Sequence, residues 1–259
     1  MKKIIALVAA CALAACAFAI AGCGKKASND YGLIKDGTLT IATEATYPPF
    51  ESLDDNGNVI GFDIDMAAAI AEKLGLKLEV KQMDFELLVP AVKAGTDCDI
   101  AVAGMGINDE RLELVDFSDL YYSDELAIAV AKSSGITGDN YKDKLATGKI
   151  AVQAGTTGEA QMKEDFPNAT IVPLAKTTDC FAGLLSGEYI AVCTNAAVVN
   201  QMIGATYKDA VVVKTIATGE EYAIAISKDD TKLKADLNQA LAELTADGTL
   251  AELLAKWGL

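Results

Sequence analysis

The chain has 259 residues, of which 51% are hydrophobic and 23% are charged, enough for one large or two modest domains. Its formal net charge is −15, and this acidic balance excludes nucleic acid as an expected partner because phosphates repel it. It contains no histidine, which excludes Ser-His-Asp and Cys-His catalysis and imidazole metal sites.

Residues 1–22 are typical of a secretory signal peptide, because two lysines precede an apolar run that ends in small residues. Ile20-Ala21-Gly22-Cys23 also resembles a bacterial lipobox, whose cysteine carries the lipid of the mature protein. Leu13-Ala14-Ala15-Cys16 is a second candidate, but Cys23 is favoured because a polar tether follows it. The alternative is an uncleaved membrane span, since residues 4–22 are long enough. Either interpretation places the rest of the chain outside the cytoplasm, attached to a membrane.

The predicted elements begin with a β-branched, alternating strand at 38–42. Pro48 and Pro49 then make a rigid, non-helical loop. A helix is expected over 66–74, a strand at 78–80, a helix over 85–93 and a short buried strand at 99–102. This alternation of strands and helices predicts an α/β domain with a parallel sheet.

The segment 103–111 joins that buried strand to a helix, with Asn108 as the expected N-cap. Its two glycines let the backbone turn sharply and expose N–H groups, which attract anions at a helix N-terminus. Arg111 lies in the first helical turn, where a cation opposes the helix macrodipole. A carboxylate held by the arginine fork would remove that conflict. The alternative interpretation is a solvated surface arginine.

A second unit interrupts the first. A strand at 126–131 is expected to lead out and one at 222–226 to lead back, with strands at 149–153, 170–173, 189–193 and 211–213 between them. Thr156 and Glu159 have the spacing of a capping box, and helices at 233–246 and 250–256 close the chain. We therefore predict lobe 1 from 37–130 and 221–259, and lobe 2 from 131–220, after a tether at 23–36. Their cleft would lie where the strands end, as ligand sites do in open α/β sheets.

Three cysteines follow the tether, namely Cys98, Cys180 and Cys193. Three thiols cannot all pair within one chain, and no C-x-x-C motif is present. A bridge between Cys180 and Cys193 remains an alternative to buried free thiols. No nucleotide-binding glycine motif is found either, so neither a metal nor a cofactor is expected.

Several short motifs occur together in the order of one known family. They are Tyr47-Pro48-Pro49-Phe50, Gly61-Phe62-Asp63-Ile64-Asp65, Ala103-Gly104-Met105-Gly106-Ile107, Glu110-Arg111, Val115-Asp116-Phe117-Ser118, Ala154-Gly155-Thr156-Thr157 and Asp247-Gly248-Thr249. Together they resemble the extracellular solute-binding proteins of polar amino acid ABC importers, bacterial family 3. The resemblance implies a periplasmic-binding-protein-like fold of type II, with two α/β lobes and a hinge of two crossing strands. It also implies a non-enzymatic protein that captures an amino acid or a related small carboxylate and delivers it to a membrane permease.

The resemblance assigns a ligand contact to each of several positions in this chain. Those implied to bind the α-carboxylate are Arg111, the Gly106 N–H, Thr156 and Thr157. Those implied to bind the α-ammonium are the Gly104 carbonyl and Asn195. Those implied to enclose or select the ligand side chain are Tyr47, Phe85, Glu44 and Gln153.

Two of these positions depart from the family pattern. Gly106 stands where a serine or threonine is usual, and Asn195 stands where an aspartate usually pairs with the ammonium. A neutral amide still accepts a hydrogen bond, but its contribution is about 0.5–1.5 kcal/mol instead of about 1.5–3 kcal/mol for a charged group. We therefore expect a reduced preference for a charged amine.

Two other functions remain open from the sequence. A dehydratase on the same scaffold would use Glu44 as a general acid if burial raised its pKa. A ligand-sensing receptor domain would bind its ligand in the same cleft. The residues do not name the ligand.

Overall fold

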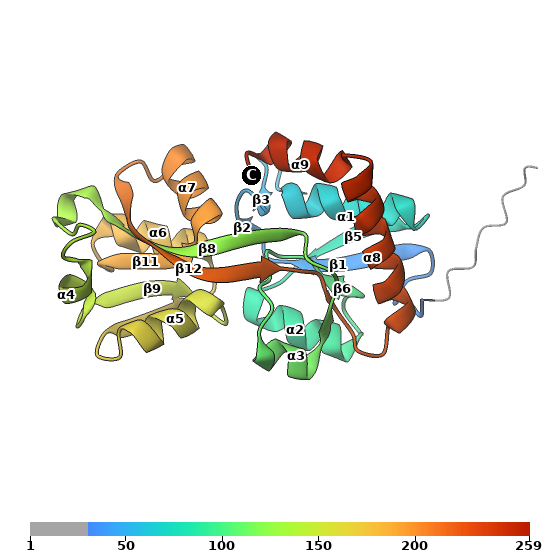
Figure 1. Ribbon diagram of the computed structural model, residues 1–259, viewed down its shortest axis with the longest axis horizontal. Helices are drawn as coiled ribbons and strands as arrows, with labels where there is room; N and C mark the ends of the chain where they lie inside the picture. The colour runs from blue at the N-terminus through green and yellow to red at the C-terminus, as the bar shows by residue number, and fades with distance from the viewer. Residues whose placement is uncertain (1–30) are drawn as a thin grey trace, which may run out of the picture. The chain divides into compact units, whose positions relative to one another are not determined.

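Two five-stranded sheets organise residues 31–259, which are the residues that the computed structural model describes (Figure 1). The expected signal peptide, Cys16, Cys23 and residues 23–30 of the tether lie outside the described residues. The first sheet has the order β5–β1–β6–β13–β7, formed by β1 (Thr38–Thr43), β5 (Lys77–Gln82), β6 (Ile100–Ala101), β7 (Asp116–Phe117) and β13 (Ala225–Ile226). The second has the order β10–β9–β11–β8–β12, formed by β8 (Tyr122–Ala131), β9 (Lys149–Gln153), β10 (Thr170–Leu174), β11 (Ala191–Asn195) and β12 (Ala210–Tyr222). A small third sheet is formed by β2 (Thr46–Tyr47), β3 (Glu51–Leu53) and β4 (Val59–Ile60).

Both large sheets are mixed, whereas the sequence predicts a parallel one. β1 pairs in parallel with β5 and β6, and β9 pairs in parallel with β10 and β11. The antiparallel strands β8 and β12 carry the chain out of the first lobe and back again, so they run in opposite directions side by side. Figure 1 shows β8 and β12 as two long neighbouring strands that run between the two lobes.

Helices flank each sheet (Figure 1). In the first lobe they are α1 (Phe62–Lys73), α2 (Phe85–Ala94), α3 (Asp109–Leu114), α8 (Thr231–Ala246) and α9 (Thr249–Trp257). In the second lobe they are α4 (Tyr141–Leu145), α5 (Thr157–Asp165), α6 (Thr177–Ser186) and α7 (Ala196–Ala205), with a short 3-10 helix at Lys132–Ser134. Within residues 31–259, no helix is both long and apolar enough to cross a membrane.

Helix α1 begins four residues before the expected start at Met66. Gly61 precedes it with φ 145°, and a Cβ there would lie 1.9 Å from the Phe50 carbonyl oxygen, so only glycine fits. Asp63 therefore falls inside the helix and is fully buried. Its carboxylate contacts the turn that carries the site.

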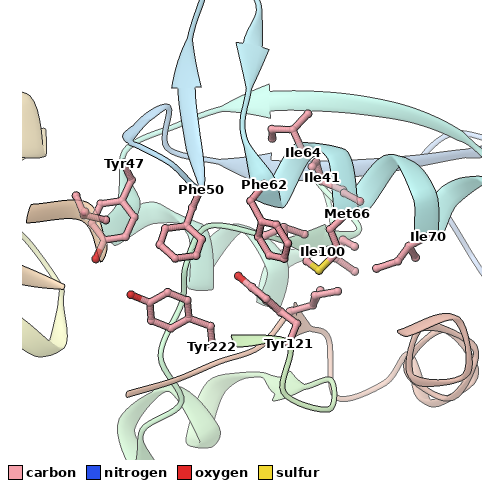
Figure 2. Close-up of a cluster of buried hydrophobic side chains, with 14 of the residues drawn as sticks. Ile41, Tyr47, Phe50, Phe62, Ile64, Met66, Ile70, Ile100, Tyr121 and Tyr222 are labelled. Atoms are coloured by element: carbon pink, nitrogen blue, oxygen red, sulfur yellow. The ribbon is translucent and has the colours of Figure 1, made fainter. Parts of the chain in front are cut away.

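A row of aromatic side chains connects the start of α1 to the returning strand β12. Phe50 packs edge-on against Phe62 and Tyr222, with ring centroids 6.2 Å and 5.2 Å away, and Tyr121 lies beside Phe62 and Tyr222. Figure 2 shows these rings side by side along the core, with Tyr47 at one end. The Tyr47 hydroxyl also contacts Asn195 of the second lobe.

The three cysteines within the described residues are free and buried, so the interpretation as free thiols is confirmed and the Cys180–Cys193 bridge is absent.

Candidate functional site

A strand, a glycine turn and a short helix build one wall of the site, as the sequence predicts. β6 leads into the turn, and Asn108 caps α3 by accepting a hydrogen bond from the Arg111 N–H at 2.8 Å. Gly104 has φ 51°, and a Cβ on it would lie 3.0 Å from the Tyr47 ring. The glycine therefore lets the turn approach this ring closely.

Arg111 is buried with 7% of its surface exposed, so the alternative of a solvated surface arginine is wrong. Its guanidinium donates to the Gly106 carbonyl and, at 2.9 Å, to the Gly155 carbonyl of the second lobe. It also lies over the Phe85 ring, 5.2 Å from the centroid. Burial lowers the pKa of Arg111, and the carboxylate of Glu220 is the largest influence that opposes this shift. A guanidinium has five N–H donors, so two carbonyl contacts leave donors for a carboxylate.

The second lobe contributes a matching turn between β9 and α5. Thr156 caps α5 by accepting from the Glu159 N–H at 3.2 Å, and the Glu159 carboxylate accepts from the Gly155 N–H at 2.8 Å. This confirms Thr156 as the cap, with the glutamate reaching back one residue beyond the usual capping box. Thr157, the first residue of α5, donates its hydroxyl hydrogen bond to Glu220 at 2.9 Å.

Glu44 and Gln153 meet between the lobes. The Gln153 side-chain amide donates to the Glu44 carboxylate at 2.8 Å, and the Thr46 hydroxyl donates to the same oxygen at 2.8 Å. Burial raises the pKa of Glu44, while these two hydrogen bonds act in the opposite direction. The Gln153 carbonyl oxygen accepts from the Thr177 hydroxyl at 3.1 Å, which fixes the orientation of the amide.

Tyr47 and Asn195 form a second contact between the lobes. The Tyr47 hydroxyl donates to the Asn195 Oδ1 atom, and the Thr194 hydroxyl lies 3.3 Å from the same tyrosine oxygen. Burial raises the pKa of Tyr47 far above its usual value, so the phenol keeps its proton. The Asn195 Nδ2 atom is buried and has no hydrogen-bond partner among residues 31–259.

Two buried carboxyl groups, Asp63 and Glu51, lie beside the turn at Gly104. Asp63 accepts from the Gly104 N–H at 2.7 Å and from the Tyr121 hydroxyl at 2.9 Å. Glu51 lies against Asp63, and within the described chain no N–H or hydroxyl group donates to its oxygens. Burial raises the pKa of Asp63 to about 6 and raises that of Glu51 well above its usual value. Burial therefore favours the protonated form of both carboxyl groups, and the negative charge of Asp63 favours it further at Glu51.

All the predicted ligand-binding residues but Glu44 line one cavity of about 10 Å³: Tyr47, Phe85, Gly104, Gly106, Arg111, Gln153, Thr156, Thr157 and Asn195. Glu44 joins them through its hydrogen bond to Gln153. Glu220, whose carboxylate lies over Gly106, was not predicted from the sequence. The available signal was an acidic side chain at the point where the chain was expected to cross between lobes. Within the described part of the chain, no group of three or more acidic or cysteine residues is arranged to hold a metal ion.

Comparison with known proteins matches residues 39–259 to the family model of bacterial extracellular solute-binding proteins, family 3. The chain is 33% identical over 267 residues to the arginine-binding extracellular protein ArtP of Bacillus subtilis, covering 99% of this chain and 98% of the relative. It is 32% identical over 225 residues to the putative ABC transporter arginine-binding protein 2 of Escherichia coli, covering 85% and 90%. A solved structure of an ancestral arginine-binding protein bound to arginine has a TM-score of 0.80 and 38% identity, covering 85% of this chain and 98% of that one.

Proposed function

The chain belongs to the bacterial extracellular solute-binding proteins of family 3, and from this premise we propose that it captures a polar amino acid between its lobes and delivers it to an ABC permease. The observation that carries the proposal is the meeting of residues from both lobes around one cavity. The relatives reported above are described as binding proteins, and the site is proposed to bind without catalysing a reaction.

The geometry supports the expected roles of the two turns. Arg111 has unused N–H donors beside the backbone of Gly106 and the N-terminus of α5, where a carboxylate is favoured. Because this arginine also contacts Gly155 across the cleft, a ligand carboxylate at this point would touch both lobes. A ligand that bridges the lobes favours their closed arrangement.

The other end of the site favours a ligand with a polar or cationic side chain. Glu44 is 5% exposed and already accepts two hydrogen bonds, so a guanidinium or amide of the ligand would find a carboxylate fixed in place. Tyr47 and Phe85 supply apolar faces for the aliphatic part of the side chain. We therefore propose arginine as the first candidate, in line with the names of the relatives.

We also propose the division into lobes at 37–130 with 221–259, and 131–220. The support is that β8 and β12 are the strands that connect the two large sheets. Attachment to the membrane through a lipid on Cys23 belongs to the same proposal and rests on the Ile20-Ala21-Gly22-Cys23 motif alone.

A thermal-shift screen followed by calorimetry tests the proposal. L-arginine, L-lysine, L-histidine and L-glutamine are each added to the purified chain, since a ligand at 100 times its Kd raises stability by about 2.7 kcal/mol. We expect L-arginine to give the largest rise, and Glu44→Gln to lose the preference for L-arginine over L-glutamine. If none of the four raises the melting temperature, the proposed function is wrong.

A further inference from the structure

Glu220 is a buried carboxylate in the site that no sequence motif explains. It lies in β12, where the pairing with β8 is interrupted between Ile216 and Glu220. Its neighbours Gly219 and Glu221 are exposed, whereas Glu220 is only 8% exposed. The hydroxyl of Thr157, a residue that lines the cavity, donates to the Glu220 carboxylate at 2.9 Å.

The space that Glu220 occupies exists because residue 106 is glycine. A Cβ placed on Gly106 would lie 2.7 Å from the Glu220 Oε2 atom, closer than such atoms approach. The carboxylate thus occupies the space that a side chain at position 106 would need. A side chain at position 106 would therefore require the Glu220 carboxylate to move.

Glu220 also gives the site a negative charge, which complements the ammonium group of an amino acid. Its carboxylate acts electrostatically on Arg111, yet among residues 31–259 Arg111 has no carboxylate oxygen within 4.0 Å of its nitrogens. A separated positive and negative group in one buried site complements the carboxylate and ammonium of a zwitterion. Two opposite charges left unbridged at low exposure are costly, and a ligand that contacts both would offset that cost.

Asn195 is poorly suited to hold the ammonium itself. Its carbonyl oxygen already accepts a hydrogen bond from the Tyr47 hydroxyl, which leaves one lone pair, and the group that has no partner is an N–H donor. An ammonium has donors only, so it requires an acceptor. Glu220 offers two acceptor oxygens, and the single hydrogen bond from Thr157 leaves acceptor capacity for an ammonium.

We propose that Glu220 is a specificity-determining residue that binds the α-ammonium of the ligand through the space left by Gly106. This rests on the proposed function, amino acid binding. It replaces the expectation that Asn195 leaves the site with little preference for a charged amine. The negative charge comes instead from the crossing strand β12.

The test compares L-arginine with 5-guanidinopentanoic acid, which lacks the α-amino group, and L-glutamine with glutaramic acid in the same way. Calorimetry is run on the wild type, on Glu220→Gln and on Glu221→Gln, a neighbouring exposed glutamate that serves as the matched control. We expect the wild type and Glu221→Gln to bind the amino acid about 30-fold or more tightly than its deaminated analogue. In Glu220→Gln most of this affinity ratio should be lost, because the variant binds the amino acid more weakly and binds the analogue with nearly unchanged affinity.

A second pair of variants keeps the test decisive if Glu220→Gln is unstable. Gly106→Ser should weaken binding of the amino acid, because the serine Cβ would meet the Glu220 carboxylate. Asn195→Asp in the Glu220→Gln background should restore the preference for the amine.

If Glu220→Gln loses the same amount of affinity for both ligands, Glu220 has a structural role only and the proposal is overturned. Tighter binding of the amino acid would also overturn it, because Glu220 would then compete with the ligand carboxylate. If the wild type binds neither amino acid, the proposed function itself fails, which is a different result from binding without a preference for the amine.

Discussion

The side chain of Gln153, at the end of β9, donates a hydrogen bond of 2.8 Å to the carboxylate of Glu44, which follows β1 in the other lobe. Tyr47 and Asn195 make a second such contact, and Arg111 and Gly155 a third. With these contacts in place the cavity holds about 10 Å³, roughly the room that one water molecule needs. An amino acid therefore cannot enter until the lobes separate.

The first prediction is that the lobes open and close about β8 and β12. Small-angle scattering should show a smaller radius of gyration with saturating L-arginine than without it, since a ligand that contacts both lobes favours their closed arrangement. Arg111→Ala at the same ligand concentration serves as the control and should show no compaction. Binding confirmed by calorimetry with an unchanged radius would rule out a hinge.

The second prediction concerns Arg111, the only arginine in the chain. Arg111→Ala should weaken amino acid binding by about 2–5 kcal/mol, the effect of removing one partner of a buried charge pair. Arg111→Lys should also lose much of the affinity, because an ammonium does not reproduce the planar fork. Calorimetry is the measurement, and Lys232→Ala, which changes an exposed cation on α8, is the control. Affinity near that of the wild type in Arg111→Ala would contradict its role as the carboxylate anchor.

The third prediction concerns the buried pair of Glu51 and Asp63. Burial raises the pKa of both groups, that of Asp63 to about 6, so the unfolded chain releases these protons at lower pH than the folded one. Stability should therefore be greatest below about pH 4 for these groups and fall as pH rises through their folded-state pKa values, by up to about 3 kcal/mol for Asp63.

Glu51→Gln tests this pair directly. The amide is neutral at every pH, so the urea midpoint should decline less between pH 6 and pH 9 than in the wild type. Glu188→Gln, which changes an exposed glutamate, should leave the wild-type profile intact. Parallel profiles for Glu51→Gln and the wild type would mean that Glu51 does not carry a proton in this range.

The fourth prediction is that Cys23 carries the lipid anchor. Cys23→Ala should release unlipidated protein or leave the precursor uncleaved, as measured by incorporation of a labelled fatty acid in cells. Cys16→Ala is the matched control and should be labelled normally. Label that persists in Cys23→Ala would move the anchor to Cys16.

Local patterns predicted the parts of the site whose partners lie close in sequence. The caps at Asn108 and Thr156 each bond a backbone N–H three residues ahead, so residue type and spacing were sufficient. The identity of the strands followed from their apolar and β-branched composition, and β9 was predicted with its observed bounds.

Contacts that depend on distant segments could not be predicted in this way. The start of α1 depends on Gly61 meeting Phe50, which leaves no periodic signal in the sequence. The expected strands at 211–213 and 222–226 left out residues 214–221, where polar residues break the apolar pattern, although β12 runs on to Tyr222 beside β8 across two register shifts. Glu220 reaches the site only because β12 returns beside the Gly106 turn, and this arrangement appears in the fold alone.

The three buried thiols have a practical consequence. Burial raises the pKa of Cys98 to about 11 and of Cys180 to about 12, and that of Cys193 is raised further, so at neutral pH these groups are not the thiolates that react with maleimides. In a chain that begins after Cys23, an introduced cysteine would therefore be labelled selectively. Glu86 is exposed and faces Gly155 across the mouth of the cleft. A fluorescent dye attached in Glu86→Cys would sense the approach of the second lobe and turn the protein into an optical sensor for its own ligand.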